Sequence, residues 1–212
     1  MSGSPGSGSP GGRRQALPPP RAEDGSSLER AIAGRRSRRS FHPDPLSEAE
    51  LGQLLWAAQG VTGPEGLRAA PSAVAAYPLE LYVARAEGLA RYVPDGHALE
   101  WRGTEDLRPA LRESAHDQES VTSAPAVFVF TAVYERSRAK LGPGADAFVH
   151  MDLGHAAENL LLQAEGLGLA GVPIAWLDPD RARDVLGLPP DETPIYLVPI
   201  GRPNGADVEE GP

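Results

Sequence analysis

Four arginines and two serines fall within six consecutive residues near the start of the chain, followed by an aromatic residue, in the run Arg35-Arg36-Ser37-Arg38-Arg39-Ser40-Phe41. The whole chain carries a formal charge of −9, whereas residues 1–40 carry +5, so the run is a local exception. Arginine suits anions because its planar guanidinium donates two parallel hydrogen bonds to a phosphate. In an extended backbone, Arg35, Ser37 and Arg39 would share one face. The run therefore indicates an anion site. The alternative is a solvated basic turn at a helix end, where cations offset the helix dipole.

Three other patterns lack the context that their chemistry would need. Residues 166–171 match the dinucleotide fingerprint G-x-G-x-x-G, which requires a strand before it and a helix after it. Here a helical pattern precedes and an apolar stretch follows, so we interpret the motif as a helix end and turn. His150 and His155 lie roughly 140° apart around a helix and cannot converge on one metal ion from it. Ser72 has no base nearby in sequence, so we expect it to form hydrogen bonds rather than act as a nucleophile. No catalytic acid, base or nucleophile is predicted.

Composition limits the class of protein. The 212 residues suffice for one domain with a real core. The absence of cysteine excludes disulfides, thiolate metal sites and a cysteine nucleophile, and it fits a reducing compartment. No apolar run approaches the roughly 20 residues of a membrane span, so we expect a cytoplasmic protein that does not bind membranes. The acidic balance argues against nucleic acid as a partner, although a basic arm from Arg13 to Arg39 keeps that alternative open.

The pattern of apolar residues predicts one folded domain over residues 26–204. Residues 1–25 are rich in Gly, Ser and Pro and are expected to form a disordered tail, with a second flexible tail over 205–212. Capping-box patterns at 26–29 and 47–50 predict two helix starts. Further helices are expected over 104–116, 147–166 and 179–186, and strands over 79–83, 92–101 (a hairpin), 126–133, 171–177 and 195–200. Because strands and helices do not alternate regularly along the chain, we predict an α+β fold, with a mostly antiparallel sheet flanked by helices.

Taken together, these segments resemble the FMN-dependent nitroreductase family and, within it, the SagB-type dehydrogenases. The resemblance runs from about Leu28 to Pro203. Besides the arginine run, its carriers are the segments 54–60, 70–73, 77–83, 152–160, 166–169 and 199–203.

The resemblance implies a homodimer with FMN at its interface and a long central helix, 147–166, in that interface. Its positions imply phosphate contacts from Arg35, Arg36, Ser37, Arg39 and Arg202. They also imply that Pro71, Ser72 and Ala73 lie along the flavin ring and that the backbone of Ala175 and Trp176 faces it from the other side. The implied reaction passes a hydride from NAD(P)H, the co-substrate, through the flavin to a small aromatic, quinone or nitro acceptor.

The chain departs from the SagB pattern at three places. Val74 stands where Gly is usual, and Ala175-Trp176 stands where Gly-Ala is usual. Azoline oxidases of this class carry a Lys-Tyr pair, and the corresponding place here is Lys140-Leu141. The missing Tyr favours a free-standing reductase over an azoline or peptide dehydrogenase of a biosynthetic cluster. A second alternative is a flavin- or ligand-binding protein with little turnover, because Trp176 could restrict the site.

Overall fold

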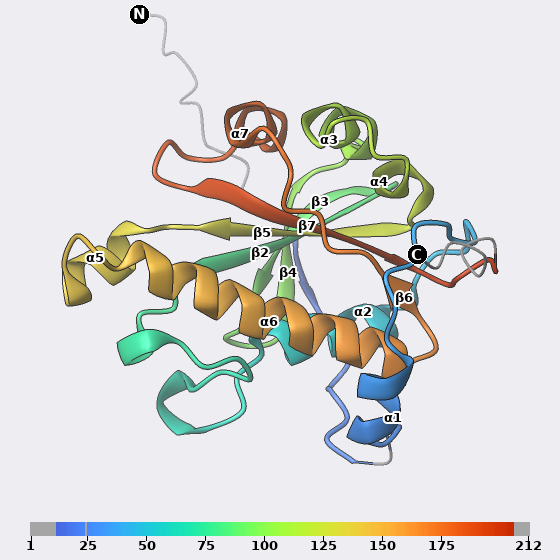
Figure 1. The fold of residues 1–212 in the computed structure, drawn as a ribbon, viewed down its shortest axis with the longest axis horizontal. Helices are drawn as coiled ribbons and strands as arrows, with labels where there is room; N and C mark the ends of the chain where they lie inside the picture. Colours follow the sequence, from blue (N-terminus) through green and yellow to red (C-terminus); the bar gives the residue numbers. More distant parts are fainter. Residues whose placement is uncertain (1–11, 24, 206–212) are drawn as a thin grey trace, which may run out of the picture.

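A computed structural model describes residues 12–23 and 25–205 (Figure 1). Seven strands form one sheet in the order β1-β4-β3-β2-β5-β7-β6, and every neighbouring pair is antiparallel. The strands are β1 (Arg14–Ala16), β2 (Leu79–Arg85), β3 (Gly88–Val93), β4 (Ala98–Gly103), β5 (Ala126–Ala132), β6 (Ala170–Gly171) and β7 (Thr193–Gly201). The α-helices are α1 (Leu28–Gly34), α2 (Glu48–Gln59), α3 (Arg108–Ser114), α4 (Ser120–Ser123), α5 (Glu135–Leu141), α6 (Asp146–Gly166) and α7 (Pro179–Leu186). The expected α+β fold is confirmed.

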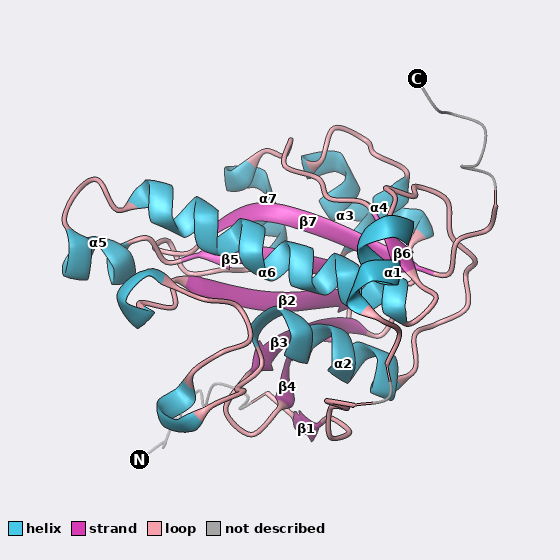
Figure 2. Ribbon diagram, turned by 60° about the horizontal axis from the view of Figure 1, so that its bottom comes forward, coloured by secondary structure: helices cyan, strands magenta, loops and turns pink. Residues whose placement is uncertain are grey.

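Helices cover both faces of the sheet (Figures 1 and 2). On one face α2 and the long α6 pack against the sheet, and Leu54, Leu160 and Phe128 are fully buried between them. On the other face α3 and α7 cover a second apolar cluster that includes Leu111 and Leu197. Because α6 crosses the middle of the sheet, segments that are distant in sequence meet along its length.

Local sequence signals account for most element boundaries. Ser47 and Glu50 form the predicted capping box: the Ser47 side chain accepts from the Glu50 backbone N–H, and the Glu50 carboxylate accepts from Ser47. Helix α7 spans the predicted residues 179–186 and is capped by Asp178, and a turn at residues 94–97 joins β3 to β4 as a hairpin. Helix α1 begins one residue later than the 26–29 pattern suggests, because Ser27 is its cap.

The structure differs from the sequence-based expectation within residues 12–23. This part of the expected tail contains β1, which pairs with the open edge of β4. Side chains of β1 also hold it there: Gln15 accepts from the Trp101 indole and donates to the Glu48 carboxylate, at 3.0 and 2.8 Å, and Arg14 donates to the Asp95 carbonyl at 2.9 Å. Leu17 adds a buried apolar contact. Residues 1–11 and 206–212 lie outside the described residues.

The expected strand over 171–177 is also shorter than predicted. It pairs as β6 at residues 170–171, continues with a hydrogen bond from the Val172 N–H to the Pro199 carbonyl at 3.2 Å, and then forms an isolated bridge between Ile174 and Leu197. Pro173 lacks the N–H that a continuous ladder would need. The remainder is an extended loop that leads to Trp176.

Candidate cofactor site

The arginine run is extended and lies beside the end of the sheet. Helix α1 ends at Gly34, and Ser37 then forms a parallel bridge with Gly171 of β6, where the Arg38 N–H donates to the Gly171 carbonyl at 3.1 Å. Further along, the His42 N–H donates to the Arg202 carbonyl at 2.8 Å. The run is therefore fixed at both ends to β6 and to the end of β7.

The side chains of the run differ in what they contact. Arg35 lies 3.6 Å from the carboxylate of Glu158 on α6. Arg36 folds back on α1 and donates to the carbonyls of Ala33 and Arg35, at 3.2 and 2.7 Å. Arg36 therefore has the role given above as the alternative, that of a cation at the end of a helix. Ser37 and Arg39 are exposed. The predicted cations and hydroxyl gather on one exposed segment.

Arg202 lies next to this segment, but its guanidinium turns to the start of α2. It donates to the carboxylate of Glu50 at 2.7 Å and to the Pro45 carbonyl at 3.4 Å. Sequence reasoning predicted the position of Arg202 beside the run but did not anticipate its ion pair.

The Glu50 carboxylate links the capping box of α2 to Arg202. Burial opposes its ionisation, but hydrogen bonds from Ser47 and Arg202 outweigh that effect, so the pKa of Glu50 is below its ordinary value. A lowered pKa in the folded state contributes stability that is present above the unfolded pKa of about 4.3, and that is lost as the pH falls through the folded pKa.

Glu50→Gln is therefore expected to lower the free energy of unfolding by about 1 kcal/mol at pH 7, because charge-assisted hydrogen bonds become neutral ones. The difference from wild type should shrink as the pH falls below about 4. Urea unfolding at several pH values measures the free-energy difference and its dependence on pH. The control is Glu29→Gln, which changes an exposed glutamate on the first turn of α1. A difference that does not depend on pH would contradict the assignment.

A second group of predicted residues lies in a strained loop. Pro71 is exposed, whereas Ser72 and Ala73 are half-buried. After them, Val74, Ala75 and Tyr77 all have positive φ, at 49°, 49° and 46°. Such left-handed conformations cost L-residues about 1–2 kcal/mol each and are found at sites where the surroundings enforce them.

Four hydrogen bonds from three side chains hold this conformation. The Asp152 carboxylate on α6 accepts from the Ala73 N–H at 3.4 Å, and the Ser72 hydroxyl accepts from the Tyr77 N–H at 2.9 Å. The Lys140 ammonium donates to the carbonyls of Val74 and Ala75, at 3.4 and 2.9 Å. The second Asp152 oxygen is buried and lacks a hydrogen-bond partner among the described residues. The expected hydrogen-bonding role of Ser72 is seen, at the residue that precedes the short 3-10 helix Ala73–Ala75.

Val74→Gly tests this strain. Gly removes the left-handed penalty but adds about 0.5–1 kcal/mol of unfolded-state entropy, and the Val74 side chain is already 57% exposed. We expect a net stabilisation of about 0.5–1 kcal/mol in urea unfolding. Val74→Ala, which keeps the Cβ atom, should gain less. A loss of more than 1 kcal/mol in the Gly variant would show that the loop is not strained at this position.

Ala175 and Trp176 lie in the loop that continues from β6. Both are exposed, and the Trp176 ring stacks on His116, with centroids 4.1 Å apart and planes 28° apart. Trp176 lies five positions after Gly171, so its Cα atom is at most about 17 Å from the Cα atom of Gly171, the residue that bridges to the arginine run.

The predicted residues thus fall into three places rather than one cavity. The run meets α6 at Glu158 and the strained loop meets α6 at Asp152, about 9 Å apart along the helix axis. Sequence reasoning missed the contact roles of Glu158, Asp152, Lys140 and His116. The acidic and histidine residues on α6 were the available signal, but sequence reasoning rejected a metal site there and did not link these residues to the run or to the loop. His150 interacts with the Tyr134 hydroxyl at 3.3 Å.

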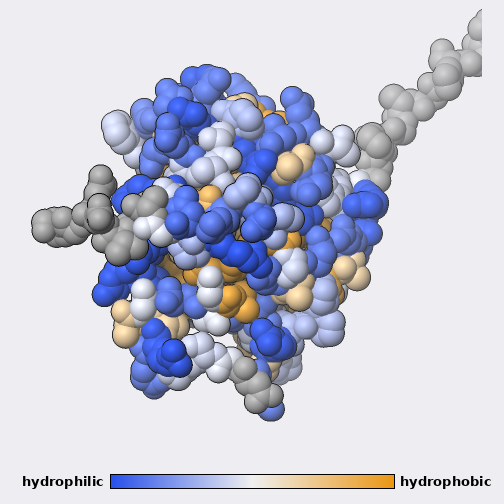
Figure 3. Space-filling view, turned by 90° about the vertical axis from the view of Figure 1, so that its right-hand side faces the viewer, coloured by the Kyte–Doolittle hydropathy of each residue, from blue (hydrophilic) through white to orange (hydrophobic). Residues whose placement is uncertain are grey.

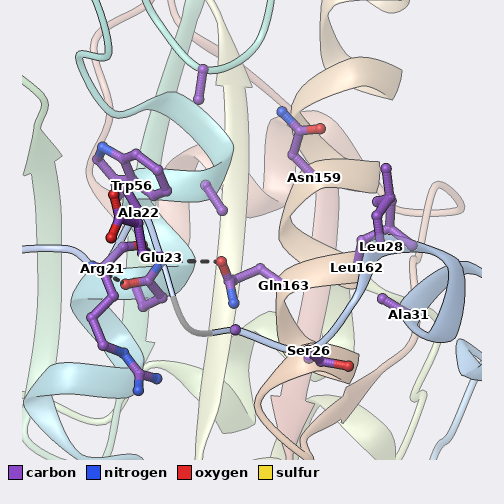
Figure 4. A pocket seen from close by; sticks show the side chains of 15 residues that line it. Arg21, Ala22, Glu23, Ser26, Leu28, Ala31, Trp56, Asn159, Leu162 and Gln163 are labelled. Atoms are coloured by element: carbon purple, nitrogen blue, oxygen red, sulfur yellow. Dashed lines mark hydrogen bonds between the residues drawn. The ribbon is translucent and has the colours of Figure 1, made fainter.

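A cavity of about 450 Å³ lies beside this region, between α1, α2 and α6 (Figure 4). The buried amide of Gln53 spans its floor, donating to the Arg21 carbonyl and to the Gln163 side chain at 3.0 and 3.1 Å. Trp56 and Leu162 supply apolar walls. None of the site residues predicted from the sequence lines it.

Comparisons with known proteins agree with the fold. A protein of Methanocaldococcus jannaschii named as a nitroreductase is 36% identical over 181 residues, covering 82% of this chain and 90% of its own. An NADH dehydrogenase of Thermus thermophilus is 32% identical, covering 85% and 87%. A crystal structure of a Ralstonia eutropha protein described as a nitroreductase has a TM-score of 0.83 and 34% identity, and the match covers 90% of each chain. The nitroreductase family model matches residues 32–202, and the chain therefore belongs to the nitroreductase family and is an oxidoreductase of that family.

Proposed function

We propose that the protein is an FMN-dependent NAD(P)H oxidoreductase that reduces small aromatic, quinone or nitro acceptors. The observation that carries the proposal is the cationic run, fixed against β6 and the end of β7 in an acidic chain of the nitroreductase family. The Thermus relative is named an NADH dehydrogenase, and this name supports a nicotinamide as the reductant.

The residues of the run fit a phosphate. Arg35 and Arg39 supply guanidinium donors, Ser37 supplies a hydroxyl, and Arg36 adds charge while its guanidinium closes α1. Arg202 contributes charge from the flank, although its ion pair with Glu50 neutralises part of it. We assign these five residues to the phosphate of FMN.

The ring would lie between the other two groups. Pro71, Ser72 and Ala73 would pack along its edge, and the backbone of Ala175 and Trp176 would face it. When bound, FMN supplies hydride transfer, so that NAD(P)H is oxidised to NAD(P)⁺ and the acceptor gains the hydride together with a proton from water. The strained loop, held by Asp152 and Lys140, would present a fixed backbone to the ring without rearrangement. No side chain is assigned as a catalytic acid or base.

A homodimer completes the proposal. Helix α6 leaves an apolar stripe uncovered: Phe148 is 42% exposed, Met151 is 57% exposed, and Gly154 has open space where a Cβ would be. Leu28 and Ile32 of α1, which packs on α6, are also exposed. Apolar surface gathers near the middle of the face that carries α1 and β6 (Figure 3). A second copy of the chain would cover this stripe, with the open position at Gly154 allowing a close helix approach.

Within the family we propose membership of the SagB-type group, acting as a free-standing reductase in the cytoplasm. Lys140, which stands where azoline oxidases carry a Lys-Tyr pair, donates to the carbonyls of the strained loop, so its ammonium is occupied by a positioning role. No helix in the described part of the chain is long and apolar enough to cross a membrane.

The competing function is a ligand-binding protein with little turnover, and the exposed Trp176 is the observation that favours it. Steady-state kinetics separate the two. With FMN saturating, initial rates at varied NADH or NADPH and varied menadione should give parallel double-reciprocal lines, as expected when both substrates use one site in turn. FMN binding without turnover above the rate of unbound FMN would select the binding protein.

A further inference from the structure

Trp176 is exposed to an unusual degree for so large an apolar side chain. Its exposed fraction is 71%, the highest among the exposed large hydrophobic residues of the described chain. Burial of an aromatic ring contributes strongly to stability, so Trp176 gains little of that stabilisation in its exposed position. Only one face of the ring is covered, by the imidazole of His116.

The backbone on both sides of Trp176 is anchored. Ile174 exchanges two hydrogen bonds with Leu197 of β7, at 2.8 and 3.0 Å, and the Asp178 N–H donates to the Ser114 carbonyl at 2.8 Å. Asp178 also caps α7. Because the loop is fixed at both ends, the orientation of the Trp176 ring depends chiefly on its stack with His116.

His116 is presented by a turn that is costly to build. His116 and Asp117 both have positive φ, at 52° and 57°, although neither is glycine. The Asp117 N–H donates to the Arg112 carbonyl at 3.0 Å, and the Arg112 guanidinium donates back to the Asp117 carbonyl at 3.2 Å. Two consecutive left-handed residues persist only when their surroundings enforce them, and they concentrate at functional sites.

The imidazole of His116 has no other specific contact in the described chain. Neither of its nitrogens forms a hydrogen bond to another described residue, so the core of the protein does not require it. The turn therefore holds an aromatic ring beneath Trp176 and has no evident packing role of its own.

We infer that His116 is a positioning residue that holds Trp176 in one orientation, and that the pair sets the size of acceptor that reaches the flavin. The inference rests on the proposed function, because Trp176 lies at the end of the loop assigned to the flavin ring. Small planar acceptors pass the ring, whereas bulky polycyclic acceptors require Trp176 to move. Once His116 no longer stacks on it, Trp176 moves more readily.

His116→Asn tests the inference with little change to the backbone, because Asn also tolerates the left-handed region but has no ring to stack. We expect kcat/KM for a polycyclic quinone to rise on the order of fivefold, mainly through a lower KM, while the value for a monocyclic quinone stays constant. The estimate follows from the usual strength of an aromatic stack. His116→Tyr restores a ring and should restore discrimination. If the ratio of kcat/KM between the two quinones is unchanged in the His116→Asn variant, the inferred selection of acceptors by size is wrong.

A spectroscopic experiment tests the stacking of His116 on Trp176 without an activity measurement. The chain has three tryptophans, and labelling with 5-fluorotryptophan gives three ¹⁹F resonances, of which Trp176→Phe identifies one. His116→Asn should shift the Trp176 resonance and leave those of Trp56 and Trp101 in place. An unmoved Trp176 resonance would overturn the positioning role. If the purified protein takes up no FMN, both the proposed function and the selection of acceptors by size are wrong. The ¹⁹F result would still show whether His116 stacks on Trp176.

Discussion

Replacing Arg35 and Arg39 together by Gln is expected to weaken FMN binding by at least about 100-fold. Each charge-assisted hydrogen bond to an anion contributes about 1.5–3 kcal/mol, and each 1.4 kcal/mol corresponds to a factor of ten in affinity. Arg35 has a second role, because it lies 3.6 Å from Glu158. That pair is half-exposed and contributes little to stability, so the variant should fold normally.

Fluorescence titration of the apoprotein with FMN measures this effect. The matched control is Arg30→Gln, which removes an exposed arginine from α1, one turn before the run. It should bind FMN like wild type. A further comparison with riboflavin, which lacks the phosphate, locates the effect: the double variant should bind riboflavin as weakly as wild type does. If the double variant keeps wild-type affinity for FMN, the run is not the phosphate site.

Placing Asp at both Phe148 and Met151 is expected to convert a dimer into a monomer. Both side chains lie on the uncovered stripe of α6, so neither substitution opens a cavity in the protomer. In a symmetric dimer each substitution would bury one unpaired carboxylate from each subunit, and each buried charge costs several kcal/mol. The dimer dissociation constant should therefore rise by at least about 1,000-fold.

Sedimentation equilibrium at micromolar concentration resolves the two states. Ala139→Asp on the exposed side of α5 is the control, since it adds one exposed aspartate outside the stripe. The control should remain dimeric and the double variant should not. A monomeric wild-type protein, or a double variant that still dimerises with unchanged affinity, would contradict the interface.

Sequence patterns predicted the parts of this fold that local chemistry determines. The capping box at Ser47 and Glu50, the helix that begins at Pro179 and the strand over 79–83 each depend on signals within a few residues, and each prediction is confirmed. The arginine run was readable for the same reason, because a cluster of cations in an acidic chain needs no tertiary information to be noticed.

The rest depended on contacts between distant segments. Strand β1 carries weak local signals and exists because β4 offers an open edge and Gln15 finds Glu48 and Trp101. The pairing of Arg202 with Glu50 joins residues 152 positions apart, and the stack of His116 on Trp176 joins two loops. The left-handed backbone at Val74 was not readable either, because a β-branched residue normally disfavours it.

The visible absorption spectrum of the purified protein tests the central claim most directly. It should be recorded before and after addition of FMN, and again after NAD(P)H under nitrogen. We predict that flavin bands co-purify, or appear on the protein after gel filtration with FMN, and that they bleach when NADH or NADPH is added. A protein that stays colourless after incubation with FMN, or whose flavin bands resist both nicotinamides, would contradict the assignment as an FMN-dependent NAD(P)H oxidoreductase.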